Sequence, residues 1–251
     1  MTARSYVYGV VAAGPLRAPP RGVHEAPVRL VDDDRVAAVV SDVEAPPHGT
    51  RRELLAHFSV VEDIAGDRTI LPVRFGTLFR SDRDVRESLL RPRVDRLRRL
   101  LGEMAGYVEL TLKAAYREDV VLGEIVEERR GVRRLRARTA ERSPDASYFD
   151  RIELGEQVVA ALAKKRTLDG AAILDRLAGL AERVEVGEPT GDYGVVRASF
   201  LVARDDVPRF DRSVADLDED MGWRIRFRYA GPLPPYSFVS LDDLQPAGRS
   251  G

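Results

Sequence analysis

A strict alternation of apolar and basic residues near the end of the chain predicts a half-buried β-strand. Residues 223–229 read Trp-Arg-Ile-Arg-Phe-Arg-Tyr. Successive side chains of a strand point to opposite faces. We therefore expect one buried face made of Trp223, Ile225, Phe227 and Tyr229, and one polar face made of Arg224, Arg226 and Arg228. The prolines that follow predict that the strand ends at Tyr229 and leads into a stiff corner.

Two further alternations belong to the same pattern. In residues 107–114 the apolar positions begin at Val108, whereas Glu109, Thr111 and Lys113 are expected to face outward. Residues 195–203 alternate likewise, with Phe200 on the buried side. We therefore expect the strands that begin at Tyr107, Val195 and Trp223 to form one sheet.

Helical spacing fills the intervals between these strands. We expect helices over residues 119–140, 148–165 and 168–184, with breaks at Ser143-Pro144 and Leu168-Asp169-Gly170, and a further helix from Asp206 to Gly222. Strand, helices, strand, helix, strand is the order of a ferredoxin-like α+β domain, in which helices cover one face of an antiparallel sheet.

The first half of the chain also mixes strands and helices. We expect a strand over 6–12, a hairpin of 28–31 with 36–40 around Asp32-Asp33-Asp34, and a strand over 69–79 with Pro72 at an edge or bulge. A capping box at Thr50 and Glu53 begins one helix, and Ser81 begins another that Pro92 interrupts. We expect two domains, 1–106 and 107–244, and a mobile tail over 245–251.

Composition narrows the class of protein. The 251 residues are 44% hydrophobic and 32% charged, with a net charge of −1, so the chain is expected to be globular without a global field for nucleic acid or membranes. It contains no cysteine, which fits a reducing cytoplasm. We expect neither a signal peptide nor a spanning helix.

The residues that usually perform catalysis are scattered. His24, His48 and His57 do not form a metal-ligand pattern, and no phosphate-binding loop or nucleophile elbow is present. An acylphosphatase-like enzyme would need a Gly-rich loop after Ala114, which the chain lacks. The residues therefore predict a binding or structural protein without cofactor or metal.

Two charged segments leave alternatives open. Asp218, Glu219 and Asp220 lie where the helix dipole disfavours acids. They are therefore expected either to pair with Arg224, Arg226 or Arg228 or to form a docking patch for a basic surface. The arginine-rich segment Arg129–Arg142 is either solvated surface or the working face of an RNA-binding module. The predicted sheet faces carry only Tyr107 as an aromatic residue, which argues against an RNA platform.

Three separated motifs resemble the GvpL/GvpF family of gas vesicle proteins. They are Tyr6-Val7-Tyr8-Gly9-Val10, the run from Leu71 to Phe79, and the final strand with its proline corner, where the family usually carries Trp in place of Leu233. The resemblance implies an accessory or minor structural protein of gas vesicles that is cytoplasmic, assists assembly and binds the small major shell protein and other accessory proteins. It implies no enzymatic activity and no nucleic acid or membrane partner.

The motifs nominate characteristic positions rather than catalytic ones. These are Arg74, Phe75, Gly76, Pro234, Pro235, Tyr236, Ser237 and Phe238. Because two successive prolines restrict the backbone, we expect the corner to hold the C-terminal segment against the protein and to shape a docking surface for the shell protein. The two aromatic residues of the corner would be its anchors.

Overall fold

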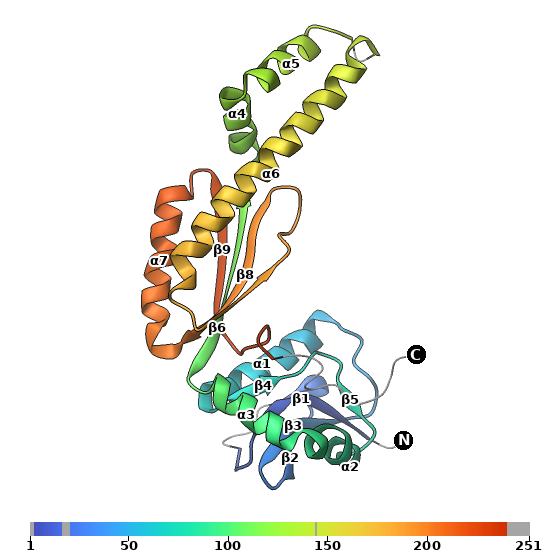
Figure 1. Cartoon of the computed structure of the whole chain (residues 1–251). Coiled ribbons are helices and arrows are strands. Elements are labelled where there is room, and N and C mark those ends of the chain that lie inside the picture. The colour runs from blue at the N-terminus through green and yellow to red at the C-terminus, as the bar shows by residue number, and fades with distance from the viewer. Residues whose placement is uncertain (1–2, 17–20, 144, 240–251) are drawn as a thin grey trace. The chain divides into compact units, whose positions relative to one another are not determined.

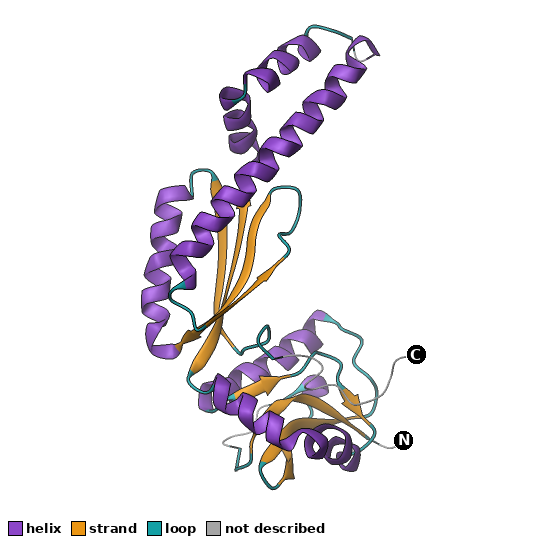
Figure 2. Cartoon of the chain, in the orientation of Figure 1, coloured by secondary structure: helices purple, strands orange, loops and turns teal. Residues whose placement is uncertain are grey.

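The computed structural model describes residues 3–16, 21–143 and 145–239 (Figure 1). Their contacts cluster into two compact units, here called unit 1 (residues 1–109 with 232–251) and unit 2 (residues 110–231). Both units combine helices with antiparallel sheets, which confirms the expected α+β class (Figure 2). A domain boundary at Gly106 stays a prediction, and the expected mobile tail lies outside the described residues.

Unit 1 contains a sheet built around its first strand. The strands are β1 (Arg4–Ala12), β2 (Val28–Asp33), β3 (Val36–Val43), β4 (Ile70–Pro72) and β5 (Leu78–Phe79). Their order is β2-β3-β1-β4, and β5 also pairs with β1. The predicted hairpin is confirmed, with Asp33 opposite Val36 and Asp34 in the left-handed region at φ 52°.

The expected single strand over 69–79 is wrong. It is split into β4 and β5 because the intervening loop turns at Gly76, which has φ 88°, and Thr77 donates its N–H to the Arg74 carbonyl at 3.3 Å. Pro72 ends the edge strand β4, where its missing N–H costs no ladder bond.

The helices of unit 1 begin where the capping residues predict. They are a 3-10 turn (Val23–Glu25), α1 (Arg51–Asp67), α2 (Asp82–Asp84), a π-helical segment (Val85–Leu90), a second 3-10 turn (Arg91–Arg93) and α3 (Val94–Met104). The capping box of α1 is present: Glu53 N donates to Thr50 Oγ1 at 3.3 Å and Thr50 N donates to Glu53 Oε2 at 2.9 Å. The Glu53 pKa falls to about 2, chiefly because His24 contacts the carboxylate. The helical path through Pro92 becomes irregular, as expected.

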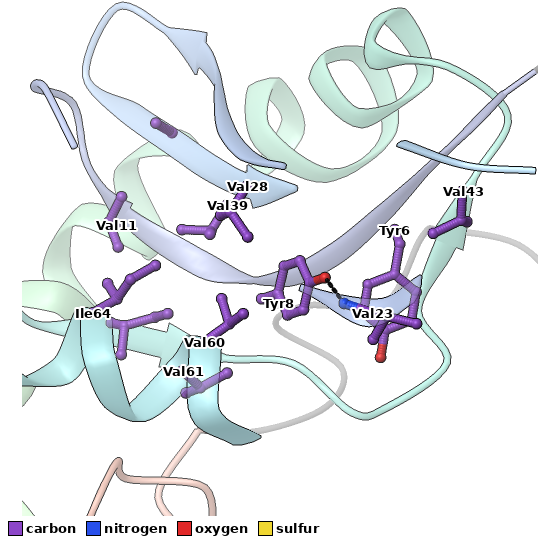
Figure 3. Close-up of a cluster of buried hydrophobic side chains, with 12 residues drawn as sticks. Tyr6, Tyr8, Val11, Val23, Val28, Val39, Val43, Val60, Val61 and Ile64 are labelled. Atoms are coloured by element: carbon purple, nitrogen blue, oxygen red, sulfur yellow. Dashed lines mark hydrogen bonds between the residues drawn. The ribbon is translucent and has the colours of Figure 1, made fainter. Parts of the chain in front are cut away.

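The core of unit 1 lies between α1 and its sheet (Figure 3). Val60, Val61 and Ile64 of α1 pack with Val11 and Val39 of the strands, all of them nearly or fully buried. Fully burying an aliphatic side chain of this size contributes about 1.5–3 kcal/mol. This packing fixes the position of α1, which carries part of the site described below.

Unit 2 contains the second sheet and the longest helix. Its elements are β6 (Tyr107–Tyr116, from residue 110 on), α4 (Glu118–Glu128), α5 (Arg130–Ala140), a 3-10 turn (Asp145–Ser147), α6 (Tyr148–Ala178), β7 (Arg183–Gly187), β8 (Gly194–Ala203), another 3-10 turn (Arg204–Asp206), α7 (Val207–Met221) and β9 (Ile225–Leu233, to residue 231). The strand order is β7-β8-β6-β9, which is the ferredoxin-like order. The three alternating segments therefore share one sheet, as predicted.

Several predicted boundaries in unit 2 are wrong. The helix expected over 119–140 breaks at Arg129, whose φ −112° and ψ 103° are extended. Conversely, α6 continues through Gly170, because this glycine lets the helix approach β8: a Cβ there would lie 3.4 Å from the Val195 carbonyl oxygen. The segment expected to remain helical to Val184 ends earlier and becomes β7.

The final strand also differs from its prediction at both ends. Trp223 precedes β9 and is 62% exposed, because the chain is still turning out of α7 at that point. Ile225 is buried, as the alternation predicts, and the strand continues past Tyr229 to Leu233. None of the helices in the described residues is long and apolar enough to cross a membrane.

Candidate functional site

Three segments that are far apart in sequence meet around α1 in unit 1. Strand β1 supplies Tyr6 and Tyr8, the loop after β4 supplies Phe75, and the proline corner supplies Tyr236. Helix α1 places His57 and Phe58 between them. We call these six residues the motif cluster, since four of them come from the three motifs recognised in the sequence.

Aromatic contacts join β1, α1 and the β4–β5 loop. The Phe75 ring lies 6.1 Å from the Tyr6 ring and 5.8 Å from the His57 ring, both in edge-to-face geometry. The Tyr8 ring stacks on His57 at 5.5 Å. Edge-to-face pairs of this kind add about 0.5–1.5 kcal/mol each beyond their buried area.

Hydrogen bonds fix the same residues. Gly76 N donates to the Tyr6 hydroxyl at 3.2 Å, and this hydroxyl lies 2.9 Å from His57 Nδ1. Because the Tyr6 oxygen accepts the hydrogen bond from Gly76, the Tyr6 hydroxyl proton is available for donation to His57 Nδ1. The Tyr8 hydroxyl donates to Ser41 Oγ at 3.0 Å and accepts from Val23 N at 2.8 Å (Figure 3). Gly76 was nominated from the sequence, whereas Tyr6, whose phenol holds the loop of Gly76, was not.

His57 is a buried, neutral member of this network. Burial lowers the pKa of His57 to about 4, against a smaller opposing effect of the Val73 backbone, and burial raises the pKa of Tyr6 and of Tyr8. The imidazole and both phenols are therefore uncharged at neutral pH. Within the described residues, no group of three or more His, Asp or Glu side chains is placed to hold a metal ion.

The proline corner is tied down by a carboxylate. Ser237 donates its backbone N–H to Glu109 Oε2 at 2.7 Å and its hydroxyl to Glu109 Oε1 at 2.6 Å. Glu109 was expected to face solvent, but it is only 3% exposed. The prediction failed because alternation along β6 carries no information about a partner 128 residues away.

The corner itself is a tight double turn. Tyr236 N donates to the Pro234 carbonyl at 2.8 Å, and Phe238 N donates to the Pro235 carbonyl at 3.2 Å. Both prolines and Phe238 are buried, whereas Tyr236 is half-buried with its ring 5.9 Å from that of Phe58. Phe238 is therefore an internal anchor, and Tyr236 lies at the edge of the cluster.

An exposed apolar edge borders the motif cluster. On α1, Leu55 is 57% exposed and Phe58 is 42% exposed, one helical turn apart. Phe75 and Tyr236, which contact the same helix, are both partly exposed. Arg74 and Gly76 are exposed in the neighbouring loop. We call Leu55, Phe58, Phe75 and Tyr236 the apolar edge.

The acidic segment at the end of α7 does not pair as expected. Asp218, Glu219 and Asp220 are exposed, and Asp220 pairs with Arg176 of α6 at 2.5 Å rather than with an arginine of β9. Arg224, one of the three expected partners, contacts other acids instead. Its guanidinium binds Glu124 through two N–H groups at 2.9 and 3.0 Å and Asp169 at 2.9 Å.

These contacts form an ionic network that the sequence reasoning missed. Lys165 also binds Glu124 at 2.9 Å, and the Tyr116 hydroxyl donates to Asp169 at 2.5 Å. An open pocket beside the network is lined partly by Leu168 and Trp223. Because the central acids accept from Arg224, Lys165 or Tyr116, the network serves to join α4, α6 and the start of β9.

The arginine-rich segment is largely the helix α5, which packs on α6. It buries Val132 and Leu135, while Arg138 binds Asp150 and Arg133 donates to the Val126 carbonyl at 3.2 Å. These contacts give two of the arginines structural roles. They favour the interpretation of this segment as a packed surface helix over that of an RNA-binding face.

Comparison with known proteins extends over nearly the whole chain. The family described as "Gas vesicle synthesis protein GvpL/GvpF" matches residues 4–240. Gas vesicle protein F of Streptomyces sp. (strain CB03234) is 30% identical over 241 residues, which cover 94% of this chain and 99% of the relative. The corresponding protein of Microcystis aeruginosa is 25% identical over 245 residues, or 96% of this chain and 100% of the relative.

The fold agrees with solved structures. The crystal structure of GvpF from Anabaena sp. PCC7120 superposes with a TM-score of 0.83 at 24% identity, covering 95% of this chain and 98% of that one. GvpF from Microcystis aeruginosa gives a TM-score of 0.78 at 22% identity, covering 95% and 99%. At these identities, the superpositions support the fold.

Proposed function

Because the chain belongs to the GvpL/GvpF family of gas vesicle proteins, we propose that it acts in vesicle assembly as an accessory or minor structural protein that binds the small major shell protein. One observation carries this proposal: the family motifs converge on a rigid cluster that presents an apolar edge. Exposed apolar groups on a rigid frame are typical of a protein-binding site.

The contacts that hold the proline corner and the Phe75 loop in place make the apolar edge suitable for binding. The double hydrogen bond from Ser237 to Glu109 and the buried Phe238 hold the corner, and the buried Tyr6 phenol holds the Phe75 loop. A partner that docks on Leu55 and Phe58 would therefore lose little free energy in ordering this surface. Aromatic residues such as Phe58 and Tyr236 offer large contact areas with few rotatable bonds.

The proposal includes a role without catalysis, in the cytoplasm and at the vesicle. The neutral, buried His57 lacks a nucleophile or metal partner among the described residues, and the remaining titratable groups of the cluster are phenols. Other gas vesicle accessory proteins are further expected partners. We propose no role in nucleic acid or membrane binding.

Co-purification tests the proposal. The tagged chain, expressed with the small shell protein, should retain that protein on an affinity resin, and a fraction should remain on isolated vesicles after washing with salt. Retention after the wash would identify a wall component, whereas binding only to free shell protein would identify an assembly factor. If the shell protein is recovered neither on the resin nor with the vesicles, the proposal is wrong.

A further inference from the structure

One face of the unit 2 sheet carries both long helices. Phe200 of β8 lies 5.0 Å from Phe210 of α7, which in turn stacks on Tyr229 of β9 at 6.0 Å. Gly170 of α6 packs against Val196 of β8. These contacts place α6 and α7 on the same side of the sheet (Figure 2).

The opposite side of this sheet is basic. Alternation along the strands places four exposed cations there, from the three neighbouring strands β8, β6 and β9. We call them the basic sheet face: Arg197, Lys113, Arg226 and Arg228. Among the strand residues of unit 2 that point to this side, the only carboxylate is Glu185 of β7, which is 3.7 Å from Arg183.

These four cations lack an ionic partner within the described residues, although the chain pairs many of its other charges. Arg224, for example, binds two carboxylates on the helix side of the same strand end. The net charge of the whole chain is −1, so the basic sheet face is a local concentration that the composition conceals. Such a concentration attracts anionic partners and speeds their association.

Strand register brings two of the cations together. Arg117 N donates to the Arg224 carbonyl at 2.8 Å, and the Thr111 hydroxyl donates to the Ala230 carbonyl at 3.5 Å. These contacts make β6 and β9 antiparallel, and the register between them places Lys113 opposite Arg228. Like charges directly opposite each other on neighbouring strands destabilise a sheet, and an external anion would relieve this repulsion.

We propose that the basic sheet face is a docking surface for an acidic segment of a protein partner. Neighbouring strands are about 4.8 Å apart, so carboxylates spaced by about 5–10 Å along the partner would meet cations on β8, β6 and β9. Thr111 and Ser199 lie on the same side. The other residues on this side of the unit 2 strands are small, aliphatic or hydroxyl side chains rather than aromatic ones. The surface therefore lacks the stacking platform typical of single-stranded RNA readers.

This surface belongs to unit 2 and is separate from the motif cluster of unit 1, so the inference does not depend on the proposed function. The probe is fluorescently labelled poly-L-glutamate, titrated with the full-length chain at low and high salt. The test variant is Arg197→Gln/Arg226→Gln/Arg228→Gln. The control is Arg130→Gln/Arg134→Gln/Arg136→Gln, which removes the same charge from exposed positions of α5.

The expected result is at least about tenfold weaker binding of poly-L-glutamate by the test variant, since three ion pairs are lost, with a change below about twofold in the control. Circular dichroism verifies that both variants fold. Equal losses in the two variants, or no binding by the wild type, would overturn the inference. So would a loss of single-stranded poly-uridylate binding in the test variant while poly-L-glutamate binding is retained, because the face would then read nucleic acid.

Discussion

Glu109 of β6 accepts both the backbone N–H and the hydroxyl of Ser237, at 2.7 and 2.6 Å. This pair closes a loop of 128 residues, and both of its members belong to unit 1. Since the carboxylate is 3% exposed, its hydrogen bonds replace the water that it lost on folding. The pair therefore anchors the proline corner to the start of β6.

Replacing this carboxylate should destabilise unit 1. Hydrogen bonds to a charged group contribute about 1.5–3 kcal/mol, so Glu109→Ala should lower the free energy of unfolding by about 2–4 kcal/mol. Urea unfolding followed by circular dichroism measures this. Glu103→Ala, at an exposed position of α3, is the charge-matched control and should change stability by less than about 0.5 kcal/mol. Equal midpoints for the two variants would show that the pair does not anchor the corner.

Phe238 should be a structural anchor rather than a contact residue. Its ring is 4% exposed, so Phe238→Ala should cost about 3–5 kcal/mol by leaving a cavity. Tyr236→Ala should lower stability less than Phe238→Ala, because Tyr236 is only half-buried. It should weaken shell-protein binding more than Phe238→Ala does. Phe149→Ala, at an 81% exposed position, is the matched control for thermal unfolding. A Phe238→Ala variant that unfolds at the wild-type temperature would contradict the anchor role.

His57 should make unit 1 sensitive to mild acid. Its folded-state pKa of about 4 lies below the ordinary value of 6.5, so the unfolded chain takes up the proton more readily. Stability from this group is fully present above pH 6.5 and falls as the pH drops toward 4, by up to about 2–3 kcal/mol. The free energy of unfolding, measured at pH 7, 5.5 and 4, should decline less with falling pH in His57→Phe than in the wild type. Parallel declines in the two proteins would rule out His57 as the source.

Arg224 should be essential to the stability of unit 2. Arg224→Ala leaves Asp169 without its cation and Glu124 with Lys165 alone, and both carboxylate side chains are 16% exposed. Removing one partner of such a pair costs about 3–5 kcal/mol when it is buried, and we expect about 2–4 kcal/mol at this partial exposure. Arg226→Ala, two residues away and exposed, should be nearly neutral. Chemical denaturation measures the free energy of unfolding of both variants. A similar loss of stability in Arg224→Ala and Arg226→Ala would show that the ionic network does not stabilise unit 2.

Local patterns predicted much of the fold. Alternation identified the three strands of one sheet, and the Thr50–Glu53 pair identified the start of α1, because both signals depend on neighbours within a few residues. Gly170 was misjudged as a helix break. Its role is close packing against β8, which depends on a strand about 25 residues further along the chain.

The candidate site was predicted only in part. The motif residues Phe75, Gly76 and Tyr236 were nominated from the resemblance, and the structure brings their segments together around α1. Glu109 and Phe58 were not nominated, because a charged residue in an alternating strand and an aromatic residue on a helix both fit their local patterns without a distant partner. Their roles emerge only when the corner and α1 are placed in space.

The affinity of the apolar edge for the small shell protein tests the central claim most directly. Leu55→Ala/Phe58→Ala removes the two most exposed members of the edge, and Leu168→Ala, at a 61% exposed position of α6, is a matched control. Binding of the purified shell protein to each immobilised variant should be at least about tenfold weaker for the double variant and unchanged for the control. Wild-type affinity in a correctly folded double variant would show that the shell protein does not dock at the motif cluster.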